Sequence, residues 1–142
     1  MTGRLVDTNV FLRHLLGDHP THSPAATRLI AAIEQGHLVG WTTALTIAEV
    51  VFVLAGKRTY NQPRSVIRAS VLPLVELPNL RITHKRLYRR VFDLWLAHPD
   101  LSFVDAYEAA LVERASPPEL YSFDMDFDAV ATVTRIDPSR IP

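Results

Sequence analysis

Residues 4–11 read Arg4-Leu5-Val6-Asp7-Thr8-Asn9-Val10-Phe11, and this stretch decides the fold. Its first three residues predict a short strand that ends at Asp7. Thr8 can cap the helix that follows, and Val10 and Phe11 begin the apolar face of that helix. A strand that leads directly into a helix is the opening expected of an α/β protein.

The alternation of strand and helix continues outward from this stretch. Short apolar runs predict further strands at residues 38–41, 80–83, 120–123 and 133–136. Apolar positions three and four residues apart predict helices at residues 24–35 (after a Ser23 cap), 43 or 46 to 54, 62–75, 84–97 and 103–114. We therefore predict an α/β fold with three layers, α/β/α, and a mainly parallel central sheet, in a single domain of residues 1–142.

The composition is that of an ordinary packed domain. Of the 142 residues, 48% are hydrophobic, which supports a core and argues against disorder. The chain has no cysteine, which excludes disulfides, thiolate zinc sites and cysteine nucleophiles. No apolar run approaches the roughly 20 residues that span a bilayer, and no secretory signal pattern opens the chain. We therefore expect no membrane association and a cytoplasmic location.

Charge is divided unevenly along the chain. Fifteen Lys and Arg residues balance fifteen Asp and Glu residues, so the formal net charge is zero. Nine of the basic residues lie between Lys57 and Arg90, a segment in which Glu76 is the one acid. This segment could form a phosphate-binding face next to an acidic pocket. The alternative is a pair of helices whose basic faces are simply solvated.

Four acidic residues occupy positions where active sites form in α/β proteins. Asp7 and Asp124 each follow a predicted strand, and ligands bind beyond the carboxyl ends of parallel strands. Glu49 and Asp105 lie in the early turns of predicted helices with apolar neighbours. Ionised carboxylates in such surroundings need a compensating positive charge.

Each acid also has a purely structural interpretation. Asp7 could cap the helix that follows it. Glu49 fits the last position of a capping box that begins at Thr46. Asp105 could interact favourably with the dipole of a helix capped by Ser102. Taken singly, each acid is more often structural than catalytic.

Taken together, the four acids favour a metal site. Converging carboxylates would repel one another unless a divalent cation lay among them. Oxygen ligands without cysteine suit Mg²⁺ or Mn²⁺, and one or two such ions can activate water for phosphodiester hydrolysis. The chain has no glycine-rich phosphate loop and no convincing nucleophilic triad, so nucleotide-binding and serine-hydrolase classes are disfavoured.

The same residues resemble the motifs of a known family. Val6-Asp7-Thr8-Asn9-Val10-Phe11-Leu12 is similar to the opening of PIN domains, and three further motifs follow in that family's order and spacing. These motifs are Ala48-Glu49-Val50, Phe103-Val104-Asp105-Ala106 and Ser122-Phe123-Asp124-Met125-Asp126-Phe127. The resemblance covers nearly the whole chain, and the chain length matches the VapC-type toxins of prokaryotic toxin–antitoxin pairs.

The resemblance implies a compact α/β/α endoribonuclease that depends on Mg²⁺ or Mn²⁺. The acids that match the metal-binding quartet of the family are Asp7, Glu49, Asp105 and Asp124, with Asp126 as an additional acid. The polar residues that match those orienting the carboxylates are Thr8, Asn9 and Ser122. The family also implies an RNA substrate, a homodimer and a cognate VapB-type antitoxin that holds the enzyme inactive.

This resemblance gives the basic segment more weight as an RNA-binding face, because phosphate contacts dominate such affinity. The residues expected to contribute are Arg64, Arg68, Lys85, Arg86, Arg89 and Arg90. Trp95, at helical spacing with Val91 and Phe92, is expected in the core instead. The alternative to an enzyme is a catalytically silent module of the same fold that binds RNA or protein. The intact acidic quartet favours the enzyme.

Overall fold

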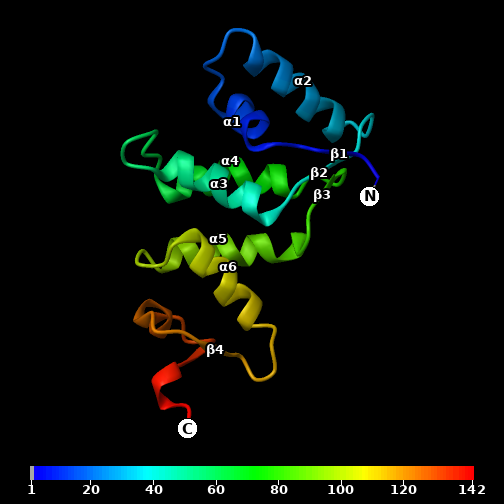
Figure 1. Ribbon diagram of the computed structural model, residues 1–142. Coiled ribbons are helices and arrows are strands. Elements are labelled where there is room, and N and C mark those ends of the chain that lie inside the picture. Colours follow the sequence, from blue (N-terminus) through cyan, green and yellow to red (C-terminus); the bar gives the residue numbers. More distant parts are fainter. Residues whose placement is uncertain (1) are drawn as a thin grey trace. The chain divides into compact units, whose positions relative to one another are not determined.

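The computed structural model describes residues 2–142, which form two compact units (Figure 1). The first unit extends to Arg86, and the second comprises Leu87–Pro142. All strand pairs among residues 2–142 are parallel, as the alternation of strands and helices predicted. They are distributed over two sheets, one in each unit. No helix within residues 2–142 combines the length and apolar character needed to cross a membrane.

The first unit contains a three-stranded sheet and its crossover helices. In chain order its elements are β1 (Arg4–Leu5), α1 (Thr8–Leu16), α2 (His22–Glu34), β2 (Gly40–Trp41), α3 (Ala44–Ala55), α4 (Arg64–Val75) and β3 (Leu80–Arg81). The sheet order is β1-β2-β3. Parallel neighbours need a long connection, and here α1 and α2 join β1 to β2 while α3 and α4 join β2 to β3.

Gly40 allows the first sheet to pack closely on its helices. It is the β2 residue that pairs with Arg4 on one side and Leu80 on the other. A Cβ atom at this position would lie 2.9 Å from Val6 Cγ2 and 3.0 Å from Ile33 Cδ1. Ile33 belongs to α2, so the missing side chain of Gly40 lets α2 approach β2.

The sequence predicts Ser23 as the cap of α2. In the structure a histidine side chain caps this helix instead. The helix begins at His22, and Nδ1 of His19 accepts hydrogen bonds from the backbone N–H groups of Thr21 and His22, at 3.2 and 2.9 Å. Ser23 Oγ accepts instead from the backbone N–H of His19. The rings of His19 and His22 stack with centroids 4.0 Å apart.

We expect this cap to make folding stability sensitive to mild acid. Partial desolvation, with neighbouring His22 and Arg13, lowers the pKa of His19 below its ordinary value of 6.5, while Asp18 opposes the shift. The unfolded chain therefore binds a proton more readily than the folded chain, and stability present above about pH 6.5 is lost as the pH falls below it. Thermal melts between about pH 7.5 and about pH 5, a range that brackets the unperturbed histidine pKa, measure this loss.

The control for this prediction is His19→Asn, because asparagine is a good cap that does not titrate. The variant should lose less stability than the wild type over the same pH range. Parallel stability curves for the two proteins would show that His19 does not contribute to the acid sensitivity.

The second unit contains a helix pair and a two-stranded sheet. The 3-10 helix η1 (Lys85–Leu87) leads into it, and its own elements are α5 (Tyr88–Ala97), α6 (Phe103–Val112), β4 (Glu119–Tyr121), η2 (Met125–Ala129), β5 (Thr134–Ile136) and η3 (Pro138–Arg140). β4 pairs in parallel with β5, with Glu119 opposite Thr134. The sequence predicts a helix from residue 84, but α5 begins at Tyr88. His84 cannot belong to the helix, because its φ of +57° lies outside the range of a right-handed α-helix.

Aromatic side chains hold α5 against α6. The ring centroid of Phe92 lies 5.1 Å from that of Phe103 and 6.1 Å from that of Trp95, and Trp95 lies 5.6 Å from Phe103. All three residues are buried, which confirms the prediction that Trp95 belongs to the core. Phe103 is the first residue of α6, so this cluster fixes where α6 begins.

Candidate active site

Asp7 lies just beyond β1, at the carboxyl edge of the first sheet. Its side chain caps α1, with Oδ1 accepting a hydrogen bond of 2.8 Å from the backbone N–H of Thr8. The structural interpretation of Asp7 as a cap is therefore correct. The cap engages one carboxylate oxygen in this bond, and Asp7 is exposed, so a second role for the carboxylate is chemically open.

Glu49 is brought to the same place by a contact across 41 residues of chain. The buried hydroxyl of Thr8 donates a hydrogen bond of 2.8 Å to Glu49 Oε2. The interpretation of Glu49 as part of a capping box with Thr46 is wrong, because α3 begins earlier and Thr43 Oγ1 accepts from the backbone N–H of Thr46. The Glu49 side chain therefore does not cap α3. Its hydrogen bond with Thr8 holds it next to the turn that carries Asp7.

Asp105 begins the acidic group of the second unit. It lies in the first turn of α6, whose N-cap is Ser102, as predicted, and Ser102 Oγ accepts from the backbone N–H of Asp105 at 3.1 Å. Burial and the nearby charge of Asp105 raise the pKa of Glu108, one turn further along α6. Glu108 is exposed at the surface, and it shares the electrostatic field of Asp105.

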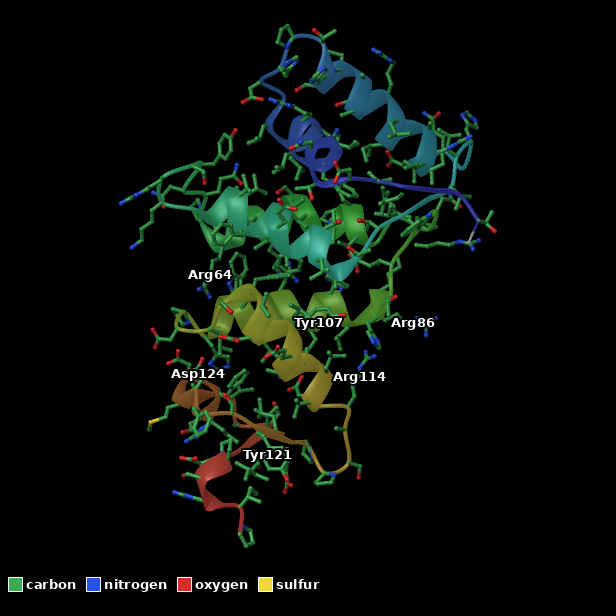
Figure 2. The ribbon with its side chains drawn as sticks, viewed as in Figure 1. Arg64, Arg86, Tyr107, Arg114, Tyr121 and Asp124 are labelled. Carbon is green, nitrogen blue, oxygen red and sulfur yellow. The ribbon has the colours of Figure 1, made fainter. Side chains whose placement is uncertain are left out.

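Asp124 and Asp126 follow β4 in a tight turn. Ser122 Oγ accepts from the backbone N–H of Asp124, and Asp124 Oδ1 accepts from the backbone N–H of Asp126, each at 2.9 Å. Asp124 thus caps the short helix η2 (Figure 2). The hydroxyl of Ser122 fixes the turn backbone from which the Asp124 carboxylate projects.

Mutual repulsion links the acids of the second unit. The pKa of Asp126 is raised, chiefly by the charge of Asp124 and further by those of Asp100 and Asp105. Asp100 was not recognised in the sequence, where it stands in a loop of ordinary composition. Its position two residues before the Ser102 cap was the one available signal. Neither unit, within residues 2–142, contains a group of three or more His, Cys, Asp or Glu side chains arranged to hold a metal ion.

Comparison with known proteins shows the family to which the chain belongs. The family model described as PIN domain matches residues 4–133, a range that includes Asp7, Glu49, Asp105 and Asp124. The chain belongs to the PIN domain family. The protein named Ribonuclease VapC7 from Mycobacterium tuberculosis (strain ATCC 25618 / H37Rv) is 28% identical over 138 residues, which cover 94% of this chain and 90% of that relative.

Asn9, the third polar residue named with the quartet, lies on α1 of this PIN domain. It is exposed and contributes to a hollow of about 470 Å³ between α1 and α2. Val10, Arg13, His22 and Leu29 line the same hollow. The Thr8 hydroxyl donates to the Glu49 carboxylate, and the Ser122 hydroxyl accepts from the backbone N–H of Asp124. Among residues 2–142, the side chain of Asn9 makes no hydrogen bond of either kind.

Lys85 and Arg90, both predicted to bind RNA, make contacts within the protein. The Lys85 ammonium donates to the carbonyl oxygens of Leu77 and Leu80, and burial lowers the pKa of Lys85. Arg90 donates two hydrogen bonds, of 2.8 and 2.7 Å, to the carboxylate of Glu113. These two cations therefore help to hold the fold.

The other predicted RNA-binding residues lie on helices. Arg64 is the first residue of α4 and Arg68 lies one turn further along it, both half-buried. Arg86 belongs to η1 (Figure 2) and Arg89 belongs to α5. Both residues are exposed. Within residues 2–142 no hydrogen bond or ion pair engages the guanidinium of Arg86, so it is the most available cation of the set.

Proposed function

We propose that this PIN domain is a metal-dependent endoribonuclease that hydrolyses RNA phosphodiesters. The observation that carries the proposal is the hydrogen bond from Thr8 to Glu49, which holds an acid of α3 beside the turn that begins with Asp7. The repulsion among Asp105, Asp124 and Asp126 in the second unit supports it further. The relative from M. tuberculosis carries the name of a ribonuclease.

We infer that Asp7, Glu49, Asp105 and Asp124 serve the same divalent ion, with Asp126 assisting. The donor set fits such an ion, because it consists of oxygens alone, which Mg²⁺ and Mn²⁺ prefer. The pKa of Asp126 is raised chiefly because negative charges lie close to it, and a bound cation would reduce their repulsion. When bound, the ion would supply an activated water and neutralise charge on the phosphate.

The polar neighbours of the acids orient them for this task. The Thr8 hydroxyl fixes one oxygen of Glu49, and the backbone N–H of Thr8 fixes one oxygen of Asp7. Ser122 holds the turn that presents Asp124. Such outer contacts set the direction in which each carboxylate can donate its remaining lone pairs.

We further propose the assembly that accompanies this activity in VapC-type proteins. The chain would act as a single domain of residues 1–142, would form a homodimer and would be held inactive by a VapB-type antitoxin. Support for the single domain comes from the family match over residues 4–133, which runs across both compact units. RNA binding would draw on the basic residues of the 57–90 segment, and Arg86 is the most available of them.

The test of the proposed function is cleavage of total cellular RNA by the purified, antitoxin-free protein. Reactions contain Mn²⁺ or Mg²⁺, and a parallel set contains EDTA. We expect discrete fragments with either metal and none with EDTA. If a folded, metal-supplemented protein leaves every RNA intact, the chain is a binding module of the PIN fold and not a nuclease.

The Thr8–Glu49 contact gives a sharper prediction. Thr8→Val keeps the shape of the side chain but removes the hydroxyl that fixes Glu49. Loss of an outer contact to a metal ligand typically lowers metal affinity or activity about 10–100-fold, and we expect the RNA cleavage rate to fall by that factor. Initial rates on one fixed RNA at saturating Mn²⁺ and at limiting Mn²⁺ measure it.

The control is Thr8→Ser, which retains the hydroxyl in nearly the same place. Its cleavage rate should return to within a few-fold of the wild-type rate. Equal rates for Thr8→Val and wild type would mean that the hydrogen bond to Glu49 has no part in catalysis.

A further inference from the structure

A small cavity of the first unit lies outside the acidic site. It has a volume of about 230 Å³ and is lined by Trp41, Thr42, Arg81, Ile82 and Thr83. These residues end β2 and β3 or directly follow them. The cavity therefore occupies the carboxyl edge of a parallel sheet, where ligands of α/β proteins bind.

The strand register places the indole and the guanidinium on the same face of the sheet. Trp41 of β2 pairs directly with Arg81 of β3, and paired residues of neighbouring strands project to the same side. The preceding pair, Gly40 with Leu80, projects to the opposite side and is buried. Trp41 is half-buried and Arg81 is exposed, so this pair faces the cavity with surface still open to a ligand.

Arg81 differs from the arginines that the fold already uses. Arg90 is held by Glu113, and Arg135 donates two hydrogen bonds to Asp128. Among residues 2–142, no acid pairs with Arg81 and no group accepts a hydrogen bond from its guanidinium. Its backbone carbonyl accepts from Thr42, which fixes the strand while the side chain stays unengaged.

The lining groups suit one nucleotide of single-stranded RNA. A guanidinium binds phosphate oxygens, and an indole stacks on the face of any base. The Thr83 hydroxyl adds a donor and acceptor for sugar or base edges. The volume is below the roughly 300–1,000 Å³ of pockets that enclose drug-sized ligands, so one base with its phosphate at the rim is the appropriate occupant.

The cavity belongs to the same sheet edge as Asp7. The backbone N–H of Val6, the residue before Asp7, donates to the carbonyl of Trp41 at 2.8 Å. The Thr42 hydroxyl donates in turn to the carbonyl of Val6 at 3.2 Å. An RNA strand whose cleaved phosphate lies at Asp7 would have a neighbouring nucleotide within reach of Trp41.

We propose that Trp41, Arg81 and Thr83 form a nucleotide subsite that binds single-stranded RNA next to the cleaved phosphodiester. The proposal rests on the proposed ribonuclease function, because that function makes the bound RNA strand a substrate. The test of the subsite does not require cleavage. Trp41 stacks on a base, and Arg81 binds the phosphate attached to it.

Binding is measured in EDTA with a short, mixed-sequence, single-stranded RNA as the probe. The chain has two tryptophans, Trp41 and Trp95, and Trp95 is buried in the second unit. The variant Trp95→Phe therefore leaves Trp41 as the one indole reporter. We expect saturating RNA to quench the fluorescence of Trp41. In an otherwise wild-type chain, Trp41→Ala should weaken RNA binding about fivefold or more, and Trp41→Phe, which keeps an aromatic face, should restore most of it.

Arg81→Gln should weaken RNA binding about five- to tenfold at moderate salt. It should also reduce the slope of log Kd against log salt concentration by the amount that corresponds to about one phosphate contact. The matched control is Arg4→Gln, which makes the same charge change on the same sheet. Arg4 pairs with Gly40, and its side chain therefore projects to the other face. This control should bind RNA within about twofold of the wild type, since it removes no phosphate contact.

The outcomes separate the subsite from the nuclease. If RNA quenches Trp41 and Arg81→Gln binds weakly while no RNA is cleaved, the subsite stands and the proposed function fails. If the protein cleaves RNA but Trp41 is not quenched and Arg81→Gln binds like Arg4→Gln, the subsite is overturned and the nuclease stands. A circular dichroism spectrum of each variant confirms that it is folded.

Discussion

Asp7→Asn and Asp105→Asn are each expected to lower RNA cleavage by more than about 100-fold, because loss of a metal ligand should exceed the 10–100-fold effect of losing an outer contact. Asparagine is a good helix cap, so the hydrogen bond that Asp7 accepts from the Thr8 backbone should survive the substitution. Loss of activity in Asp7→Asn would therefore report on the charge and not on the fold of α1.

The same substitutions should not destabilise the metal-free protein. In the second unit the charges of Asp105 and Asp124 raise the pKa of Asp126, so removing a negative charge from this group relieves repulsion. We expect Asp105→Asn to melt at the same temperature as the wild type or slightly higher in EDTA. Asp18→Asn is the matched control, because Asp18 is not one of the acids assigned to the site and its 3.8 Å surface pair with Arg13 is an interaction of little energetic value. Full activity in Asp7→Asn or Asp105→Asn would remove that residue from the site.

Phe92→Ala is expected to destabilise the protein by about 3–5 kcal/mol, the usual effect of truncating a buried aromatic residue. Phe92 is fully buried, and its ring packs against those of Trp95 and Phe103. Because Phe103 opens α6, the cavity would lie directly under the first turn of the helix that carries Asp105. Urea unfolding followed by circular dichroism measures the change in the free energy of unfolding.

The control is Phe123→Ala in the same unit, because Phe123 is 72% exposed. Exposed substitutions of this kind usually change stability by no more than about 0.5 kcal/mol. Equal losses for the two variants would contradict the assignment of Phe92 to the core.

Much of the candidate site could be predicted from local sequence. Asp7 and Asp124 follow short strands, and Ser102 begins a helix in the manner that its sequence indicates. These features depend on residues within a few positions of one another, so propensity and capping rules suffice. The burial of Trp95 was likewise visible from its helical spacing with apolar neighbours.

Side-chain contacts that form only in the folded chain explain what could not be predicted. The sequence left two starts for α3 open, at residue 43 or 46, and the structure has the earlier one, with a Thr43 cap. The hydrogen bond that holds Glu49 comes from Thr8, which is distant in the sequence and could not be predicted. Local sequence also gave no reason to expect an imidazole nitrogen of His19 as the cap of α2. The carbonyl partners of Lys85, which belong to the loop after α4 and to β3, required the fold as well.

The central claim is that acids from distant parts of the chain bind the same catalytic ion, and Mn²⁺ titration followed by electron paramagnetic resonance tests it most directly. The free Mn²⁺ signal is recorded against protein concentration for the wild type, Asp7→Asn, Asp105→Asn and Asp18→Asn. We predict that the wild type and Asp18→Asn remove free Mn²⁺ from solution, while Asp7→Asn and Asp105→Asn both bind it at least tenfold more weakly, the lower end of the effect of disturbing a metal site. Mn²⁺ binding by both variants with wild-type affinity would contradict the account.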